Sequence, residues 1–265
     1  MRTFLCQACG TSFPQADAPP GGCRICLDGR QYVPATGQAW TDRGQLAASH
    51  RNAWQAVEPN LFSIQTVPAF AIDQRAFLLR TPGGNILWDC IALIDEATEA
   101  LVRGLGGIGA IAISHPHYYT TMQDWAAAFD APIHLHEADS EWICRPSAAI
   151  RLWRGDSFEL APGTTLVRGG GHFSGGTVLH HADEGGGLIL SGDILQVTPG
   201  GHGVSFMWSY PNMLPLGAEE IRGIERRLAP WPFERIYGAF AGKDIRSGGK
   251  EIVRRSVARY LDRLR

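Results

Sequence analysis

The sequence has little net charge and no long run of apolar residues. Its 265 residues carry 24 basic and 26 acidic side chains, which gives a formal net charge of −2. Such a balance disfavours binding to nucleic acid or to an anionic membrane surface, so we expect neither as a partner. No stretch approaches the roughly 18 apolar residues that identify a membrane-spanning helix.

A secretory signal is also lacking at the start of the sequence, MRTFLCQACG, which has neither an apolar segment nor a small-residue cleavage site. Four of the six cysteines form two Cys-x-x-Cys pairs, which fit metal-bound thiolates in a reducing compartment better than a disulfide framework. We therefore expect a cytoplasmic protein. Cys90 and Cys144 stand alone and are interpreted as small buried apolar residues.

The apolar content of 45% is enough for a sizeable core, and the texture of the sequence predicts three parts. Residues 1–38 are rich in Pro, Gly and Cys and have almost no periodic apolar pattern, which predicts a small four-cysteine module. Residues 39–57 are predicted to be a connecting segment whose amphipathic helix covers 42–57, because apolar side chains recur there at helical spacing. Residues 58–265 are predicted to form one larger domain.

Within the larger domain, short strand-like runs and turns give way to alternating helices and strands. The first half predicts an antiparallel meander and then alternation, with strands at 61–67, 76–80, 86–90, 110–114 and 132–136 and helices near 94–104, 121–129 and from 137. The second half predicts strands near 164–168, 176–181, 187–191 and 235–240, a loop-rich stretch at 194–217, a helix near 217–228 and a closing helix. This order predicts an α/β protein with two sheets face to face and helices outside.

Two cysteine pairs, Cys6-x-x-Cys9 and Cys23-x-x-Cys26, are separated by 13 residues. Four thiolates in a segment with so small a core predict a closed structural zinc site. The alternative is a redox Cys-x-x-Cys, which normally begins a helix in a βαβ unit that is not predicted here. The segment resembles zinc-ribbon or rubredoxin-like knuckles, and iron is the alternative metal. A site closed by four cysteines has no open position for substrate, so we expect it to contact a protein partner.

Histidines and an aspartate stand at three predicted strand ends. His115 and His117, in SHPHYYTT, point the same way in an extended segment and can bind one ion. His172 lies in the glycine-rich stretch GGGHFSGGT, and Asp193 follows an apolar strand in LILSGDILQ. Ligands from separate strand ends can converge at one edge of a sandwich, so these four residues are the candidate metal ligands.

The order and surroundings of these residues resemble the metallo-β-lactamase fold superfamily over roughly residues 58–245. The family pattern is HxHxDH, a histidine in a GHxxG-like loop, an aspartate in a GD turn and a final histidine in a GHG-like turn. The resemblance implies an αββα four-layer sandwich. It also implies that His115, His117 and His172 bind a first metal ion, and that Asp193 is the carboxylate that bridges two ions in dinuclear members.

The sequence departs from that pattern at the second metal site. Tyr119 and Thr120 stand where the family has aspartate and histidine, and the turn YGAFAGKD offers Ala241, with Lys243 close by, in place of the final histidine. The resemblance therefore implies a single ion held by three imidazoles and one carboxylate. Zinc, iron(II) and manganese are the alternatives for that ion, with one or two positions open to water or substrate.

Tyr118 and Tyr119 are candidate catalytic residues, together with Asp193, because a phenol beside a cation can donate a hydrogen bond or act as an acid or base. The alternative is that both rings only pack in the space of the lost second ion. Thr121 and Asp124 have the spacing of a capping box at the start of a helix, which predicts a structural role for Asp124.

The long loop PGGHGVSFMWSYPN contains further candidates. His202, Trp208 and Tyr210 are predicted to line a substrate cleft, with Lys243 as a fourth substrate-binding candidate, because long irregular loops often cover binding sites. The alternative is a loop merely pinned by its aromatic side chains. We expect the remaining strand histidines at exposed or rim positions: His134, His136, His180 and His181.

Three functions are compatible with these residues. The first is a metal-dependent hydrolase of a small ester, thioester, lactone or phosphoester; the second is a non-catalytic binding or scaffold protein that retains the fold; the third is an iron-dependent oxidoreductase. Loss of the second metal site weighs against ordinary two-ion hydrolysis. Retention of all four candidate ligands favours the hydrolase, because unpaired polar groups at a strand edge carry a desolvation cost.

Overall fold

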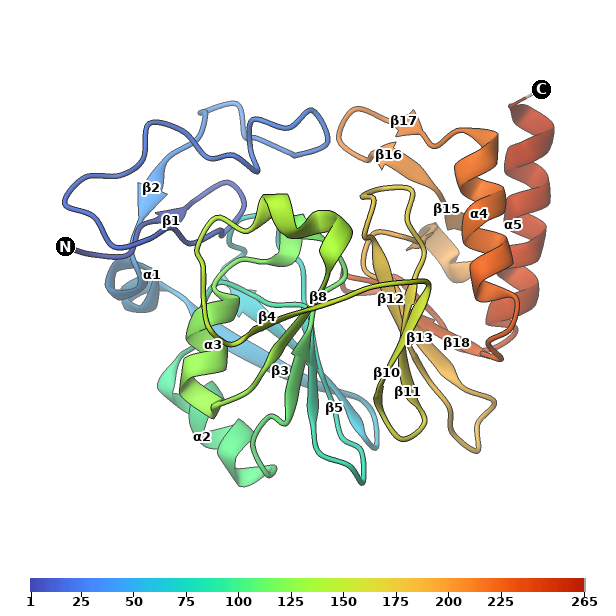
Figure 1. Ribbon diagram of the computed structural model, residues 1–265, viewed down its shortest axis with the longest axis horizontal. Helices are drawn as coiled ribbons and strands as arrows, with labels where there is room; N and C mark the ends of the chain where they lie inside the picture. Colours follow the sequence, from blue (N-terminus) through green and yellow to red (C-terminus); the bar gives the residue numbers. More distant parts are fainter. Residues whose placement is uncertain (265) are drawn as a thin grey trace. The chain divides into compact units, whose positions relative to one another are not determined.

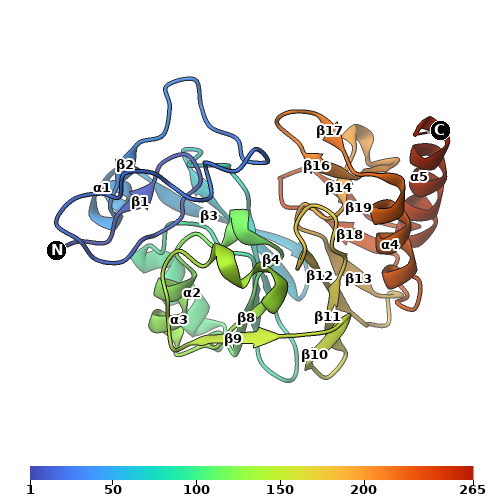
Figure 2. The same cartoon turned by 45° about the horizontal axis from the view of Figure 1, so that its top comes forward.

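The chain is described here by a computed structural model that covers residues 1–264 (Figure 1). It divides into two compact units, of which the first contains Met1–Leu135 and Ser140–Leu152 and the second contains His136–Asp139 and residues from Trp153 onward. Each unit has one large sheet and its own helices, as Figures 1 and 2 show. The division into 1–38, 39–57 and 58–265 stays a prediction.

The sheet of the first unit has seven strands in the order β3-β4-β5-β6-β7-β8-β9. Strands β4 to β6 form the predicted antiparallel meander, β3 extends it by a further antiparallel strand, and β6, β7 and β8 are parallel. The strands are β3 Arg51–Glu58, β4 Leu61–Val67, β5 Ala76–Leu79, β6 Ile86–Trp88, β7 Ala110–Ala112, β8 Ile133–His136 and β9 Ile150–Trp153. Strands β4 to β8 confirm predicted strands, whereas β9 was not predicted.

The predicted helix over 42–57 is wrong in its second half. Helix α1 covers only Arg43–Ser49, where the Asp42 side chain caps its start by accepting a hydrogen bond from the Gln45 N–H at 3.0 Å. Residues 51–58 are strand β3 instead, paired antiparallel with β4. The Trp54 ring lies 6.4 Å from that of Phe62 on the neighbouring strand, so cross-strand packing overrides the helical spacing of the apolar residues.

Two further helices belong to this unit, α2 Glu96–Gly104 and α3 Met122–Phe129, with the short 3-10 helix η1 Pro116–Tyr118 between β7 and α3. Asp95 caps α2 by accepting a hydrogen bond from the Thr98 N–H at 2.8 Å. A second 3-10 helix, η2 Glu137–Trp142, follows β8 where a helix was predicted. The four-cysteine module precedes all of these elements, and its strand β1 Leu5–Cys6 pairs antiparallel with β2 Trp40–Thr41 of the segment that follows it.

The second unit has a six-stranded sheet in the order β10-β11-β12-β13-β18-β19, antiparallel except between β13 and β18. Its strands are β10 Ser157–Ala161, β11 Thr164–Arg168, β12 Thr177–His181, β13 Leu188–Leu190, β18 Arg235–Tyr237 and β19 Asp244–Ile245. The predicted loop-rich stretch contains two small hairpins and a 3-10 helix: β14 Gln196–Val197, η3 Pro199–Gly201, β15 Val204–Ser205, β16 Met207–Ser209 and β17 Leu214–Pro215.

Helices α4 Ala218–Leu228 and α5 Gly249–Arg263 lie side by side in this unit (Figure 1). Ile221 and Ile224 of α4 and Val253 and Val257 of α5 are buried in one apolar cluster with residues of the sheet, including Ile189. The predicted closing helix is thus present, with Val253 and Val257 in the core. Burial of such aliphatic side chains stabilises the packing by roughly 1.5–3 kcal/mol each.

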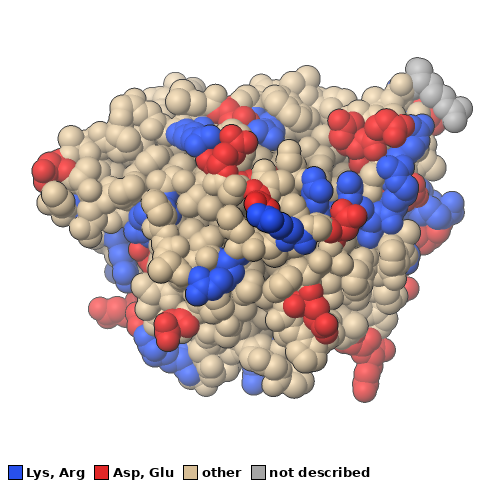
Figure 3. Space-filling view, viewed as in Figure 1, with Lys and Arg blue, Asp and Glu red and all other residues tan. Residues whose placement is uncertain are grey.

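Acidic and basic side chains are mixed over the face shown in Figure 3. Among the described residues, none of the helices has both the length and the apolar character that crossing a bilayer demands.

Candidate metal centre

The four cysteines of the module form one group, as predicted. Their sulfur atoms lie within 4.8 Å of one another, with 3.5 Å between Cys6 and Cys26 and 3.6 Å between Cys9 and Cys23. A tetrahedral zinc ion with Zn–S bonds of about 2.3 Å separates its sulfur ligands by about 3.8 Å. All four cysteines are free of disulfide bonds, so the donor set fits a closed zinc site.

The ionisation of the sulfurs also suits a cation. Hydrogen bonds from Cys23, then Cys26 and Cys9, hold the pKa of Cys6 well below its ordinary value. Burial raises the pKa of Cys9 well above its ordinary value. A cysteine whose pKa is raised, such as Cys9, loses its proton when a divalent ion binds, so metal binding at the module should release protons.

The first histidine pair lies directly after β7 in the first unit. Both side chains are buried, their rings lie 5.0 Å apart, and one nitrogen of His115 lies within 4.8 Å of one of His117. The Ser114 N–H donates to Asp89 Oδ1 at 2.7 Å, and Ser114 Oγ lies 2.8 Å from His115 Nδ1. The serine therefore orients the ring so that Nε2 of His115 is the nitrogen presented to an ion.

His117 sits inside η1, and Tyr118 follows it with its ring 4.3 Å from the ring of His115. Tyr118 and Tyr119 are both buried, and Thr120 beside them has a positive φ of 33°. A positive φ is rare for a β-branched residue and identifies a strained turn. Tyr119 and Thr120, which stand where the family has ligands of the second ion, are thus buried and packed within this unit.

The predicted capping box at the start of α3 is wrong. The Thr121 side chain makes no cap bond, and its hydroxyl lies 3.2 and 3.0 Å from the carbonyl oxygens of Ile91 and Ala92. Asp124 instead accepts a hydrogen bond from Arg145 at 2.6 Å. Thr121 therefore anchors the end of residues 114–121, which contain His115 and His117 and are called the histidine turn, to the loop of Ile91 and Ala92. Asp124 is structural, as predicted, but through its contact with Arg145 rather than through a cap.

His172 lies in the glycine-rich loop before β12 in the second unit, and it is buried. Its Nδ1 is 2.9 Å from the carbonyl oxygen of Trp208, which can only accept, so Nδ1 carries the proton. In the neutral ring Nε2 then has the lone pair that a metal ligand needs. The loop is held by the Gly175 N–H, which donates to Asp139 Oδ1 at 2.7 Å.

Asp193 follows β13 and is also buried, and one of its carboxylate oxygens lies within 4.8 Å of a ring nitrogen of His172. The Tyr210 hydroxyl donates to the main-chain oxygen of Asp193 at 2.9 Å, and its ring lies 5.8 Å from that of His172. Burial raises the pKa of Tyr210 well above its ordinary value, so its phenol keeps the proton that fixes the aspartate backbone. Tyr210 thus supports two candidate ligands.

The other substrate-binding candidates stay predictions. His202 is exposed after η3, and the side chain of Trp208 is 38% exposed while its carbonyl binds His172. Lys243 is half-buried and closes a turn in which its N–H donates to the Phe240 oxygen at 3.1 Å.

The expectation that all the remaining strand histidines are exposed or at a rim is wrong for two of them. His136 and His180 are 6% and 3% exposed, and each binds a carbonyl oxygen through Nε2, that of Gly155 at 3.0 Å and that of Pro232 at 2.7 Å. Burial lowers the pKa of both rings. Polar satisfaction by a backbone carbonyl therefore lets a neutral imidazole serve as a core side chain.

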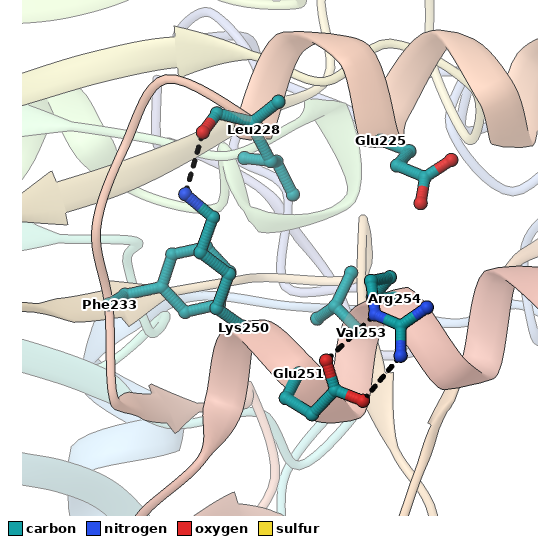
Figure 4. Close-up of a pocket in the computed structure, with 8 residues that line it drawn as sticks. Glu225, Leu228, Phe233, Lys250, Glu251, Val253 and Arg254 are labelled. Carbon is teal, nitrogen blue, oxygen red and sulfur yellow. Dashed lines mark hydrogen bonds and ion pairs between the residues drawn. The ribbon is translucent and has the colours of Figure 1, made fainter.

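A hollow of about 340 Å³ lies between α4 and α5 in the second unit (Figure 4). Leu228, Phe233 and Val253 line it, and three of its charged side chains bind other groups of the protein. Lys250 donates to the carbonyl oxygens of Ala229 and Trp231, and Arg254 pairs with Glu251. None of the candidate metal ligands lines this hollow.

The orienting residues Asp89, Asp139 and Gly175 were missed by sequence reasoning. Asp89 and Asp139 each accept a hydrogen bond from a backbone N–H, and Gly175 leaves room for Asp139 because it has no side chain. Neither effect produces a local sequence pattern. A Cβ at Gly175 would lie 2.8 Å from Asp139 Oδ2, which explains the glycine at that position.

Comparison with known proteins places the chain in a family. The Bacillus subtilis (strain 168) protein named "Uncharacterized protein YmaE" is 44% identical over 272 residues, which cover 100% of this chain and 97% of YmaE. The chain belongs to the YmaE family. No family model matches the sequence.

Solved structures show the fold of this YmaE-family chain. VMB-1 matches 81% of the chain and 99% of its own with a TM-score of 0.60 and 10% identity, and DIM-1 metallo-beta-lactamase matches 78% and 96% with a TM-score of 0.58 and 12% identity. A Cronobacter sakazakii metallo-beta-lactamase described by a HARLDQ motif matches 83% and 97% with a TM-score of 0.52 and 19% identity. The predicted metallo-β-lactamase fold is confirmed.

Proposed function

We propose that the chain is a metal-dependent hydrolase with a mononuclear site, in which His115, His117, His172 and Asp193 bind one zinc, iron or manganese ion. The substrate class that we propose is a small ester, thioester, lactone or phosphoester. The observation that carries the proposal is the fixed tautomer of buried His172, whose Nδ1–H donates to the Trp208 carbonyl and whose Nε2 is therefore a ligand nitrogen.

Two further observations support it. All four candidate ligands are buried. Burial of a carboxylate or an imidazole costs free energy that polar partners or a bound ion offset. The HARLDQ motif in the description of the Cronobacter sakazakii neighbour also differs from HxHxDH, at its third and sixth letters, in a protein called a metallo-beta-lactamase. A motif changed at its sixth letter, the position of Thr120 here, is thus compatible with an enzyme of this fold, while the fifth-letter aspartate of that neighbour is replaced by Tyr119 in this chain.

The chemistry would divide between an ion and the protein side chains. A bound ion would polarise a carbonyl or phosphoryl oxygen and lower the pKa of its water toward about 7. Tyr118 and Tyr119 would donate hydrogen bonds to the oxygen that gains charge, and Asp193 would orient the water as well as bind the ion. His202, Trp208 and Lys243 would contact the substrate. A protein partner for the four-cysteine module is a separate prediction.

The test is a count of ions per full-length chain by elemental mass spectrometry. We expect two ions in the native chain and one in His115→Ala or His172→Ala, while the control His50→Gln keeps two because His50 ends α1 and is not a ligand. Nitrophenyl acetate, a thioester, a lactone and a nitrophenyl phosphodiester are then screened with the native chain. Turnover of one of them should be lost in His115→Ala.

A native chain that carries one ion, and takes up no second when zinc, iron(II) or manganese is added, would contradict the proposal. Binding of the second ion without turnover of any of the four substrates would favour the scaffold hypothesis instead.

A further inference from the structure

The four-cysteine module contacts the histidine turn through Ser12, within the first unit. The Ser12 N–H and the Ser12 hydroxyl both donate to the carbonyl oxygen of Thr120, each at 2.9 Å. Ser12 is 1% exposed and Thr120 is 2% exposed, so these bonds are shielded from water. The module thus binds the backbone three residues after His117.

Close packing at Gly10 accompanies these bonds. A Cβ at Gly10 would lie 3.3 Å from Cγ2 of Thr120 and 3.2 Å from Cβ of Ala92, and Gly10 has a φ of +78°. Glycine alone combines this backbone conformation with so close an approach. The loop around Gly10 therefore lies close both to Thr120 of the histidine turn and to Ala92, whose carbonyl binds Thr121.

The position of Ser12 depends on the cysteine ligands. The Cys6 N–H donates to the Thr11 oxygen at 3.0 Å, the Gly10 N–H donates to the Cys6 oxygen at 2.8 Å, and the Cys9 sulfur lies 3.2 Å from Thr11 Oγ1. Residues 6–12 thus form a closed loop around two of the four sulfurs. An ion held by the cysteines would rigidify this loop and with it both donors of Ser12.

A second contact fixes the module to the same unit. Arg24 and Arg30 lie over the ring of Trp142 at 5.3 and 5.4 Å, and Arg24 pairs with Glu141 at 3.1 Å. Arginine above an indole face is a favourable arrangement. The module therefore contacts the first unit at two separate places, and one of them is the turn that carries candidate ligands.

The strained turn explains why such support matters. Thr120 has a positive φ, and this conformation persists only where the surroundings hold it. The hydroxyl of Thr121, the next residue, donates to the Ala92 carbonyl, and the two bonds from Ser12 fix the Thr120 carbonyl. Without them the turn would relax toward an ordinary conformation, and the direction of His117 would change.

We propose that the four-cysteine module positions the turn of His115 and His117, with Ser12 as the positioning residue, so that metal in the module raises the affinity of these histidines for their ion. This inference rests on the proposed mononuclear site. It assigns the module a role inside its own chain, in addition to any contact with a partner.

The test uses full-length chains that carry one zinc ion in the module, into which Co²⁺ is titrated while its visible absorption is recorded. We expect Ser12→Ala to weaken Co²⁺ binding by about tenfold or more, as removal of orienting contacts does at other metal sites, and to change the absorption spectrum. Ser12→Thr keeps both donors and should restore binding. Gly10→Ala disturbs the same contact independently and should resemble Ser12→Ala.

Gln7→Ala is the matched control, since Gln7 belongs to the same loop and its side-chain amide donates to the Trp40 oxygen at 3.0 Å rather than to Thr120. It should bind Co²⁺ like the native chain. Native affinity and spectrum in both Ser12→Ala and Gly10→Ala would overturn the inference and leave the proposed function intact. If the native chain binds no Co²⁺ beyond the module, the proposed function fails, and the inference fails with it.

Discussion

Gly175 holds the loop of a candidate ligand through the absence of a side chain. Its N–H donates to Asp139, and a Cβ there would lie 2.8 Å from the carboxylate and 3.0 Å from Cβ of His136. We predict that Gly175→Ala displaces the His172 loop, lowers the free energy of unfolding by about 1–3 kcal/mol and reduces metal content. Chemical denaturation and elemental analysis measure the two effects.

Gly104→Ala is the matched control, because nothing lies within 4 Å of the Cβ that it adds at the end of α2. It should be neutral or slightly stabilising, since alanine has the higher helix propensity. Equal stability and metal content in Gly175→Ala and Gly104→Ala would show that the loop tolerates the added methyl group.

A second prediction concerns the buried neutral histidine at position 180. Burial lowers the pKa of His180 from its ordinary value of 6.5, so the unfolded chain binds a proton more readily than the folded chain. The stabilisation is fully present above pH 6.5 and is lost as the pH falls through the folded pKa. We predict a loss with a limiting slope of about 1.4 kcal/mol per pH unit, measured by urea denaturation between pH 7.5 and 5.

His180→Gln should flatten this slope, since glutamine does not titrate and its amide can still donate to the Pro232 carbonyl. Only the slopes are compared, because the substitution also changes packing against the Trp231 ring, whose centroid is 5.2 Å away. An unchanged slope in the variant would assign the acid sensitivity to other groups, such as buried His136.

The candidate ligands were predictable from the sequence because they stand in recognisable motifs. The residues that orient them were not, since Asp139 and Tyr210 act on backbone atoms that are distant in sequence, and Ser114 is itself fixed by Asp89, 25 residues away. Tyr210 was predicted from its loop to line a substrate cleft, and its hydroxyl contacts the Asp193 backbone. A motif gives the identity of a ligand, whereas its orientation depends on tertiary contacts.

At the scale of secondary structure, Lys250 joins two helices. It belongs to the first turn of α5 (Figure 4). Its ammonium group donates to the carbonyl oxygens of Ala229 and Trp231, just after α4, at 2.6 and 3.0 Å. A cation is favourable at the carboxyl end of a helix. We predict that Lys250→Met lowers the free energy of unfolding by about 0.5–1 kcal/mol, measured by thermal denaturation.

Lys250→Arg keeps the charge and its donors and should lose less stability than Lys250→Met. If both variants unfold like the native chain, the two hydrogen bonds contribute nothing net, as is common for exposed polar contacts.

The errors in the predicted elements have a common cause. The spacing of apolar residues in 42–57 fits a helix, yet residues 51–58 pair with β4 and half-bury Trp54 on one face of an edge strand. Strands at 150–153 and 157–161 were missed because both are largely exposed or half-buried and lack a clear alternation. Local periodicity predicts elements that bury one face, and it fails at the edges of a sheet.

Removal of metal from the whole chain should lower its stability in two stages. We predict that a chelator lowers the melting temperature of the native chain in two steps, because two sites lose ions that bind the folded state. A variant such as His172→Ala should show one step, since the module alone still holds an ion. Differential scanning calorimetry with stepwise chelation measures this, and zinc should restore the starting value. A native chain that shows the same single step as His172→Ala would contradict a second metal site.

The fold itself was predictable from three short segments, because the metallo-β-lactamase pattern places its ligands at strand ends in a fixed order. The substrate was not, since the candidates in the loop of His202 and Trp208 have no family motif. The conformation of this loop depends on tertiary contacts, such as that between the Trp208 carbonyl and His172, which residue spacing does not record.

Hydrogen–deuterium exchange at the Ser12 amide would report on the contact between the cysteine module and the histidine turn. This amide proton belongs to the cysteine module but points at a carbonyl of the histidine turn, so it exchanges with deuterated solvent only when the two separate. Its exchange rate therefore reports the opening of that single contact without any label or substitution. Followed residue by residue in the native chain, it would show whether the module detaches before the rest of the protein unfolds.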